Sequence, residues 1–244
     1  MQYNTSFQTA DRLKRELMVS GIPALDTLLS GGYEFGLVHL FYGNPVFQED
    51  LLRAAVWAQL PVDRGGYESP VIIIDSSNMI DTVLITDYSS ECNLEVEDVM
   101  DNIFVSRAFN SSQTYDLIIN RLDEFLERIP ARILLVPGLP DIFIAEGLTA
   151  EKLQQVTHMA ARLMARTLEH ELVTLVTTRQ QPATRALSSD AQVHIFVERT
   201  PMRVTYSLTK HPCLPTKTES RMKYEARFGV TLPLDYYFGD LNTT

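Results

Sequence analysis

The sequence has few of the features that mark secreted, membrane-bound or metal-dependent proteins. It contains only two cysteines, Cys92 and Cys213, too few for a disulfide framework or a cysteine-rich zinc site, so we expect two buried free thiols. The five histidines show neither H-x-x-x-H nor H-E-x-x-H spacing, which argues against a metal centre. No run of about 18 apolar residues and no basic-then-apolar signal pattern occurs. We therefore expect a soluble protein with no membrane contact, cytoplasmic or, if the source is eukaryotic, nuclear.

Positive charge is also scarce. Lysine and arginine total 21 against 31 aspartates and glutamates, which gives a formal net charge of −10. Nonspecific binding of nucleic acid depends on basic side chains that neutralise phosphates, and no basic run is visible. The composition therefore favours protein partners over DNA. Arg179 and Arg185 remain a candidate phosphate contact, although we prefer to interpret them as solvated surface arginines.

What the chain does contain is an alternation of apolar runs and amphipathic stretches within 244 residues, which suits one domain with a single sizeable core. The runs too apolar to have a wet face predict buried strands at 37–42, 71–75, 103–105, 133–136 and 173–178. Helices are expected at 24–29, 51–60 and 149–169, and over a segment that buries Leu117, Ile118, Leu122, Phe125 and Leu126. The inner stripe of the 149–169 helix is expected to be Leu153, Val156, Ala160, Leu163, Met164 and Leu168.

This order predicts an α/β fold, a mostly parallel twisted sheet with helices on both faces. Residues 193–198 and 203–208 are expected to form an antiparallel pair at the sheet edge. We divide the chain into an N-terminal arm at 1–18, a core at 19–225 and a C-terminal tail at 226–244.

The stretch 40–52 reads as a buried strand, a turn and the start of a helix, which is where nucleotide-binding α/β proteins hold phosphate. A working phosphate loop there has the pattern G-x-x-x-x-G-K-[ST]. Only Gly43 fits this pattern. Gln48 stands at the second glycine, Glu49 at the lysine and Asp50 at the hydroxyl residue.

The exchange of a lysine for Glu49 reverses the sign of the interaction with phosphate. Two unit charges about 4 Å apart interact by roughly 4 kcal/mol at an effective dielectric near 20. Acidic side chains are also favourable at a helix N-terminus. We therefore predict that Glu49 and Asp50 form an internal anion in the place of a phosphate, that the site is closed to ATP, and that no cofactor is bound.

Four stretches in one order resemble the RecA-type strand-exchange recombinases of archaea and eukaryotes and their paralogues. They are the glycine-rich segment 20–36, the Q-L-P-V-D-R-G-G segment 59–66, the segment 99–110 with its R-A-F-N ending, and H-P-C-L-P at 211–215. Together they span roughly residues 7 to 220. The resemblance implies a RecA-like P-loop core.

The same resemblance implies catalytic residues that this chain replaces. The strand 133–136 should end in the Walker B aspartate that holds Mg²⁺, and Pro137 stands there. A catalytic glutamate should follow Asp75 by two residues, and Ser77 stands there. Phosphoryl transfer needs a phosphate cradle, a metal ligand and a water-positioning residue together. We therefore expect a pseudo-ATPase with degenerate Walker motifs, not an enzyme.

One partner element of the family is present, the F-x-x-A sequence formed by Phe7-Gln8-Thr9-Ala10. In the family this segment adds a strand to a neighbour's sheet edge, with Phe7 and Ala10 in two apolar pockets. A lone Phe7 packed on its own helix is the simpler alternative. The family's two DNA loops correspond to 145–149, which lacks arginine, and to 181–192, which is short.

The resulting hypothesis is a non-catalytic recombinase paralogue that binds a recombinase or another paralogue as a hetero-oligomer. It would modulate filament assembly in homologous recombination, with DNA contact indirect or weak. Three alternatives stay open: an ATPase that completes its site with a partner subunit, a KaiC-like scaffold, and a single-stranded DNA-binding module. The last would use Arg179 and Arg185 with the C-terminal basic residues Lys210, Lys217, Arg221 and Lys223.

Overall fold

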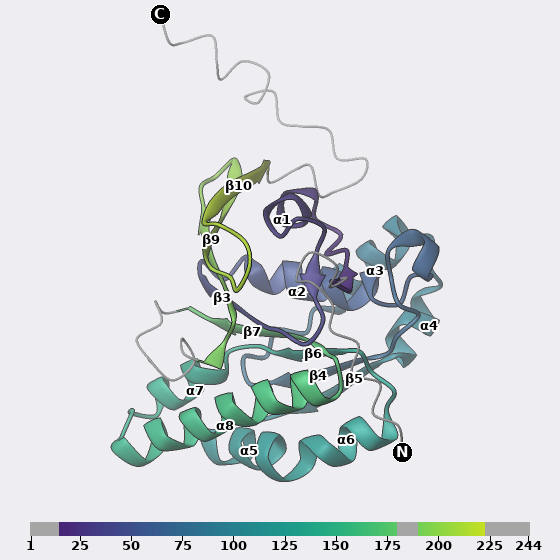
Figure 1. Ribbon diagram of the computed structural model, residues 1–244. Coiled ribbons are helices and arrows are strands. Elements are labelled where there is room, and N and C mark those ends of the chain that lie inside the picture. The colour runs from purple at the N-terminus through teal and green to yellow at the C-terminus, as the bar shows by residue number, and fades with distance from the viewer. Residues whose placement is uncertain (1–14, 180–189, 223–244) are drawn as a thin grey trace, which may run out of the picture.

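The computed structural model describes residues 15–179 and 190–222 of the chain, and its central element is an eight-stranded sheet (Figure 1). The strand order across the sheet is β10-β9-β8-β3-β7-β6-β4-β5. Six strands run parallel: β3 (Val38–Gly43), β4 (Val71–Asp75), β5 (Ile103–Arg107), β6 (Ile133–Val136), β7 (Val173–Thr178) and β8 (Val193–Arg199). Two antiparallel strands, β9 (Arg203–Lys210) and β10 (Lys217–Met222), extend it. A separate two-stranded sheet pairs β1 (Leu17–Met18) with β2 (Tyr33–Glu34).

Helices cover both faces of the large sheet (Figure 1). One layer contains α1 (Pro23–Leu28), α2 (Phe47–Trp57), α3 (Thr82–Glu91) and α4 (Val96–Asp101), and the other contains α5 (Ser111–Asp116), α6 (Leu122–Arg128), α7 (Leu139–Ala145) and α8 (Ala150–Glu169). A 3₁₀ turn, η2 (Val62–Arg64), follows α2, and a π-helical turn, η3 (Leu117–Arg121), joins α5 to α6. Successive strand residues point to opposite faces, so Leu40 and Phe41 belong to different core clusters. The predicted α/β architecture is confirmed.

The parallel strands explain the continuous apolar runs in the sequence. Every residue of β4, β6 and β7 is buried, as expected for strands covered by helices on both faces. The strand predicted at 103–105 is present as part of β5, but the expectation that it is buried was wrong. β5 lies at the edge of the sheet, and Phe104 and Val105 are each 42% exposed.

The opposite edge contains a strand that the sequence analysis missed. The last strand expected from the sequence is 203–208, but residues 217–222 form β10 and pair with β9 over six positions. Its sequence, Lys-Thr-Glu-Ser-Arg-Met, has no apolar alternation. Pairing with β9, and not hydrophobicity, makes it a strand, and its buried side chain is Arg221.

Other sequence-based expectations were partly wrong in detail. α2 begins at Phe47, four residues earlier than predicted, so the acidic residues Glu49 and Asp50 lie in its first turn. On α8, Val156, Ala160 and Leu163 are buried as expected, whereas Leu153 and Leu168 are exposed. In the preceding helical segment Ile118, Leu122 and Leu126 are buried, and Leu117 and Phe125 are only partly so. Cys92 is a buried thiol, but Cys213 is exposed.

The parallel strands end at a common edge, and this topology positions the candidate site. The carboxyl ends of neighbouring parallel strands lie together, where open α/β sheets bind ligands. The loop after β3, residues 75–77 after β4, and the turn after β6 all belong to this edge. Within the described residues, no helix is both long and apolar enough to cross a membrane.

Candidate functional site

The loop between β3 and α2 begins with Gly43, whose backbone has a φ of 108°. A Cβ atom at this position would lie 2.5 Å from the carbonyl oxygen of Val197 and 2.8 Å from the ring of Phe196. The next residue, Asn44, donates its backbone N–H to the same Val197 oxygen at 2.8 Å. Glycine is thus required here by the close approach of β8 and by its left-handed conformation.

The loop's N–H groups are the ones that a phosphate loop would present to a nucleotide, and they are already bonded. The N–H groups of residues 46–49 donate to the Asn44 side chain and to the carbonyl oxygens of Asn44, Pro45 and Val46, at 3.0 to 3.5 Å. Pro45 has no N–H at all. The segment therefore forms a tight turn that closes on itself, and a phosphate would have to break these bonds before it could be held.

Asp50 forms a buried triangle of hydrogen bonds with two residues from the antiparallel strands. Its Oδ1 accepts a hydrogen bond from Arg221 at 2.9 Å and its Oδ2 accepts one from the Tyr206 hydroxyl at 2.8 Å. Arg221 also donates from Nε to the Tyr206 oxygen at 2.8 Å. All three side chains are buried. This network ties α2 to β9 and β10, 156 and 171 residues away along the chain.

The electrostatics of the triangle follow from its burial. Burial raises the pKa of Asp50, and the Arg221 charge and the Tyr206 hydrogen bond oppose that rise. Burial and the neighbouring Asp50 also raise the pKa of Tyr206, so the phenol stays a proton donor. Asp50 is thus an internal anion whose countercharge is Arg221. Glu49 is only half-buried and is not part of the triangle.

The positions that the resemblance marks as catalytic lie close together beside the loop. Gln48 donates from its side-chain amide to the Ser77 hydroxyl at 3.4 Å. A Cβ atom added to Gly138, the residue after the buried Pro137, would lie 2.8 Å from the Cβ of Ser77. These residues come from α2, the end of β4 and the end of β6, and a hollow of about 240 Å³ lies beside residues 75–78.

Asp75 is the carboxylate at the end of β4, and its oxygens are engaged by the backbone. They accept the N–H of Ser77 at 3.0 Å and the N–H of Met79 at 3.1 and 3.2 Å, and Arg107 approaches one of them to 3.9 Å. Among the described residues, no group of three or more acidic, histidine or cysteine side chains is arranged to hold a metal ion. Within the part of the chain that the structure describes, this edge thus offers no lysine for a γ-phosphate and no cluster of carboxylates for Mg²⁺.

The candidate DNA contacts are spread over the molecule. Arg179 is exposed at the end of β7, where its backbone N–H donates to the carboxylate of Asp141 at 3.0 Å. Arg221 is buried against Asp50, which corrects the alternative in which it contacts a DNA phosphate. Lys217 pairs with Glu219 at 2.8 Å. Phe7, Ala10, Arg185 and Lys223 lie outside the described residues.

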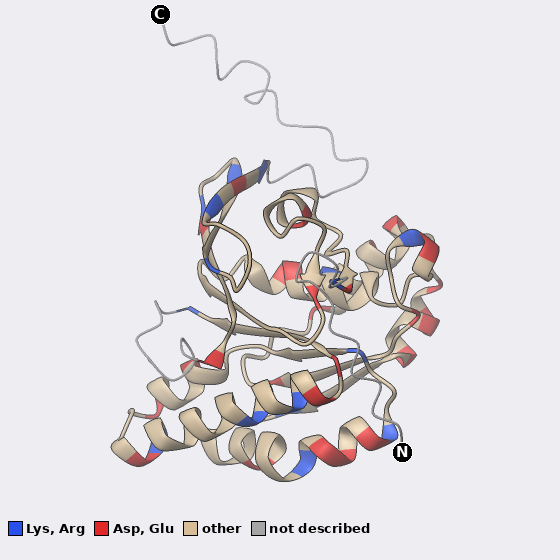
Figure 2. Cartoon of the chain, viewed as in Figure 1, with Lys and Arg blue, Asp and Glu red and all other residues tan. Residues whose placement is uncertain are grey.

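The segment at 145–149, which corresponds to a DNA loop of the family, is tied back to the core. Glu146 accepts the backbone N–H of Ser111 at 2.8 Å and pairs with Lys152 at 2.8 Å. These hydrogen bonds, with Lys152 the largest contributor, lower the pKa of Glu146 to about 2. Acidic residues also predominate along α3 and α4 (Figure 2). Neither surface suits a polyanion.

An exposed apolar edge is the surface that sequence reasoning missed. β5 pairs only with β4 among the described strands, and Phe104, Val105 and Phe109 are exposed along and just beyond it. A hollow of about 550 Å³ lies beside its start, lined by Pro70, Asn102, Phe104, Phe125, Arg128, Ile129 and Pro130. The only signal in the sequence was that the apolar run 103–105 is shorter than the others and is followed by Ser106 and Arg107.

The comparison with protein families agrees with this geometry. The family model for Rad51 matches residues 12–197, which is most of the chain and includes the loop after β3, the strands β3 to β7 and nearly all of β8. The match ends before β9 and β10, so Tyr206 and Arg221 lie outside it. The chain belongs to the Rad51 family of RecA-like proteins.

Proposed function

We propose that this chain is a non-catalytic member of its family, a pseudo-ATPase that binds a recombinase or another paralogue and modulates filament assembly in DNA repair. Membership of the Rad51 family makes it a RecA-like protein related to recombination and repair. The finer role is our inference from the site. Its partner function rests on surfaces of the core and on the arm at 1–18.

The observation that carries the proposal is the closed loop after β3. A phosphate loop works because several backbone N–H groups converge on the phosphate oxygens. Here the N–H groups of residues 46–49 are bonded within the turn, and Pro45 lacks one. The degenerate Walker positions Gln48, Ser77 and Pro137 surround this turn, and none of them supplies a charge for phosphate or magnesium.

The negative charge of Glu49 at the lysine position also supports a site that is closed to ATP. Glu49 would meet the γ-phosphate at a position where the working loop places a cation. At about 4 Å and an effective dielectric near 20, the change from attraction to repulsion amounts to several kcal/mol, because each interaction is worth roughly 4 kcal/mol. ATP would have to overcome this repulsion as well as the cost of opening the turn.

The exposed edge of the sheet supports the partner role. Unpaired edge strands present N–H and C=O groups to which another chain can add a strand. Natural proteins usually protect such edges with charge, whereas β5 exposes Phe104 and Val105. We assign β5 and the adjoining hollow to contact with a recombinase protomer, and the Phe7 arm to contact with the same or a second protomer.

Isothermal titration calorimetry with ATP and Mg²⁺ tests the closed site, with the recombinase of the same source as the positive control. We expect no binding tighter than about 10 µM, which corresponds to roughly −7 kcal/mol. Tighter binding by the isolated chain would refute the pseudo-ATPase assignment. Binding by a complex with a partner, but not by the chain alone, would favour the alternative of a site completed in trans.

Co-purification with the host's recombinase tests the arm. Phe7→Ala removes the side chain that would fill the larger apolar pocket, and we expect it to weaken co-purification at least tenfold, or about 1.4 kcal/mol. Gln8→Ala, at a position of the F-x-x-A sequence that does not enter a pocket, is the matched control. An unchanged yield with Phe7→Ala excludes the arm as the contact.

A further inference from the structure

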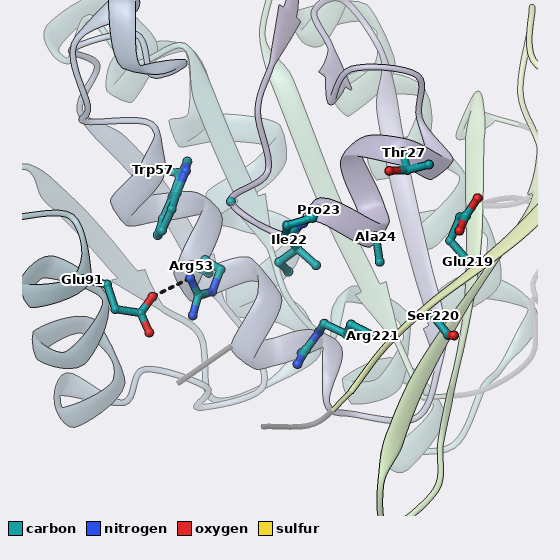
Figure 3. Close-up of a pocket in the computed structure, with 11 residues that line it drawn as sticks. Ile22, Pro23, Ala24, Thr27, Arg53, Trp57, Glu91, Glu219, Ser220 and Arg221 are labelled. Carbon is teal, nitrogen blue, oxygen red and sulfur yellow. Dashed lines mark hydrogen bonds and ion pairs between the residues drawn. The ribbon is translucent and has the colours of Figure 1, made fainter. Parts of the chain in front are cut away.

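A cavity of about 470 Å³ lies between α1, α2, α3 and β10 (Figure 3). Ile22, Pro23 and Ala24 form its wall at the start of α1, and Arg53 and Trp57 project from α2. Glu91 and Arg221 close it from α3 and β10. Its volume falls within the range of about 300 to 1,000 Å³ that is typical of binding pockets.

The charged groups around this cavity, which include Glu219, are each paired with a neighbouring side chain. Arg53 pairs with Glu91 at 2.6 Å, and its guanidinium lies 4.2 Å from the Tyr88 ring centroid and 5.0 Å from that of Trp57. Arg221 is paired with Asp50. A charged occupant would have to compete with these buried pairs, so the cavity favours a mainly apolar side chain with at most a polar tip.

We propose that the cavity is the docking site of residues 223–230 of the same chain, with the aromatic side chains of Tyr224 and Phe228 as anchors. The first argument is where the described chain stops. Residues 219–221 of β10 line the cavity, and Met222 is the last residue described. An extended chain spans about 3.3 to 3.6 Å per residue, so Tyr224 and Phe228 lie within about 11 and 25 Å of Arg221.

The second argument is composition. Residues 223–230 contain two aromatic side chains, Tyr224 and Phe228, in eight positions, against 9% aromatic residues in the whole chain. Segments that stay solvated are poor in aromatic residues, because each aromatic side chain can bury about 150 to 250 Å². A stretch this aromatic requires an apolar surface, and the described cavity nearest to its first residue is this one.

The third argument is tethering. A segment attached directly to the wall of its pocket experiences an effective concentration of about millimolar for a short linker. Even weak contacts of one or two aromatic rings then suffice to keep the pocket occupied. This inference concerns the face of α2 that packs toward β10 and goes beyond the proposed function, on which it does not depend.

The single tryptophan of the chain makes the test direct, because Trp57 lines the cavity. In the full chain we expect the Tyr224→Ala/Phe228→Ala variant to shift Trp57 emission to the red. We also expect its quenching constant with acrylamide to rise about twofold, because the indole loses an apolar cover. Truncation after Met222 should give the same change, and circular dichroism of both proteins should show an intact fold.

A synthetic peptide of residues 223–230 provides the converse test. Added to the truncated chain at about millimolar concentration, the range set by the tether, it should restore the emission of the full chain. The matched control is Tyr236→Ala/Tyr237→Ala/Phe238→Ala, which removes three aromatic rings from the chain beyond the docking segment and should leave Trp57 unchanged.

Three results would overturn the proposal. Emission and quenching that are unaltered by Tyr224→Ala/Phe228→Ala would show that the cavity is not covered by this stretch. A response to the triple variant alone would place another part of the segment there. A Trp57 signal that changes with protein concentration would show that a second copy, and not the same chain, supplies the occupant.

Discussion

At the scale of single residues, Asp50 stands at the position where a working phosphate loop has a metal-binding hydroxyl. In this protein its carboxylate forms a core ion pair with Arg221 instead. The pair is deeply buried, with Arg221 8% and Asp50 1% exposed. Buried pairs contribute little net stability when intact, because desolvation offsets their attraction. The removal of one partner is different, since the other charge is then left in the core.

We therefore predict that Asp50→Ala lowers the free energy of unfolding by about 3 to 5 kcal/mol. The reason is that Arg221 and the Tyr206 hydroxyl lose their acceptor. Urea denaturation measures the change. Glu124→Ala, which breaks the exposed pair with Arg128, is the control and should cost less than about 1 kcal/mol. Equal losses in the two variants would show that the triangle is not a core element.

His39 is the second residue with a measurable signature. It is fully buried on β3, and its Nε2 accepts the backbone N–H of Glu34 at 3.3 Å. The pKa of His39 is lowered from 6.5 to about 3. Burial is the largest cause of this decrease, and the nearby His211 is a further one. The unfolded chain therefore binds a proton on this side chain between about pH 6.5 and pH 3, whereas the folded chain does not.

The sign of the effect follows from this difference. The contribution of His39 to the free energy of unfolding is fully present above about pH 6.5. It is lost as the pH falls toward 3, at up to about 1.4 kcal/mol per pH unit. In urea unfolding between neutral and mildly acidic pH, His39→Gln should show a shallower loss of stability than the parent. His170→Gln, at an exposed position, should keep the parent's slope. Parallel curves for His39→Gln and the parent would contradict the assignment.

At the scale of elements, the two edges of the sheet differ in how they are protected. β10 places charged and polar side chains outward and packs near α1. β5 exposes apolar side chains and pairs with β4 alone among the described strands. A charge on an edge strand opposes the addition of another strand. This contrast makes β5 the edge on which partner binding can be tested without disturbing the core.

Val105→Lys should weaken co-purification with the recombinase at least tenfold, or about 1.4 kcal/mol, and leave the free energy of unfolding nearly unchanged. The side chain is 42% exposed, so the lysine ammonium can reach water in the free protein but would be covered by an added strand. Val83→Lys on α3, where the valine is 66% exposed, is the matched control. Full retention of binding by Val105→Lys would exclude β5 as the contact.

At the scale of the whole molecule, four separate segments contribute to the candidate nucleotide site that we propose is closed to ATP. The loop after β3 bonds its own N–H groups, Ser77 meets Gln48, Pro137 ends β6, and β10 ties down α2 through Arg221. A local change in one segment leaves the others in place. We therefore propose that the site differs from a working one in shape as well as in its single residues.

We predict that Gln48→Gly/Glu49→Lys, which restores two residues of the phosphate-loop pattern and spares Asp50, does not produce ATP binding tighter than about 10 µM. Calorimetry with Mg²⁺ measures it, after a check that the variant unfolds in urea like the parent. The reason is that Pro45 still lacks a backbone N–H, Ser77 still provides no carboxylate and Pro137 still provides no metal ligand. Tight binding by the variant would show that those two side chains alone keep nucleotide out.

The amino-acid sequence by itself determined the parallel body of the protein and the place of the candidate site. Strands such as β4 and β6 are buried on both faces, so their apolar runs could be identified without knowledge of their neighbours. The motif order located Gln48, Ser77 and Pro137, because parallel strands bring their carboxyl ends to one edge wherever they occur in the chain. The family resemblance rested on the same local features.

Only the tertiary structure decided which strands lie at the edges and what the charged residues contact. The Arg221–Asp50 pair joins positions 171 residues apart, and neither residue carries a local signal of burial. The exposure of Phe104 and the strand conformation of the polar residues in β10 can be predicted only when their neighbours in the sheet are known. The physical reason is that burial and pairing depend on what lies across the sheet, and side-chain identity along the chain does not report it.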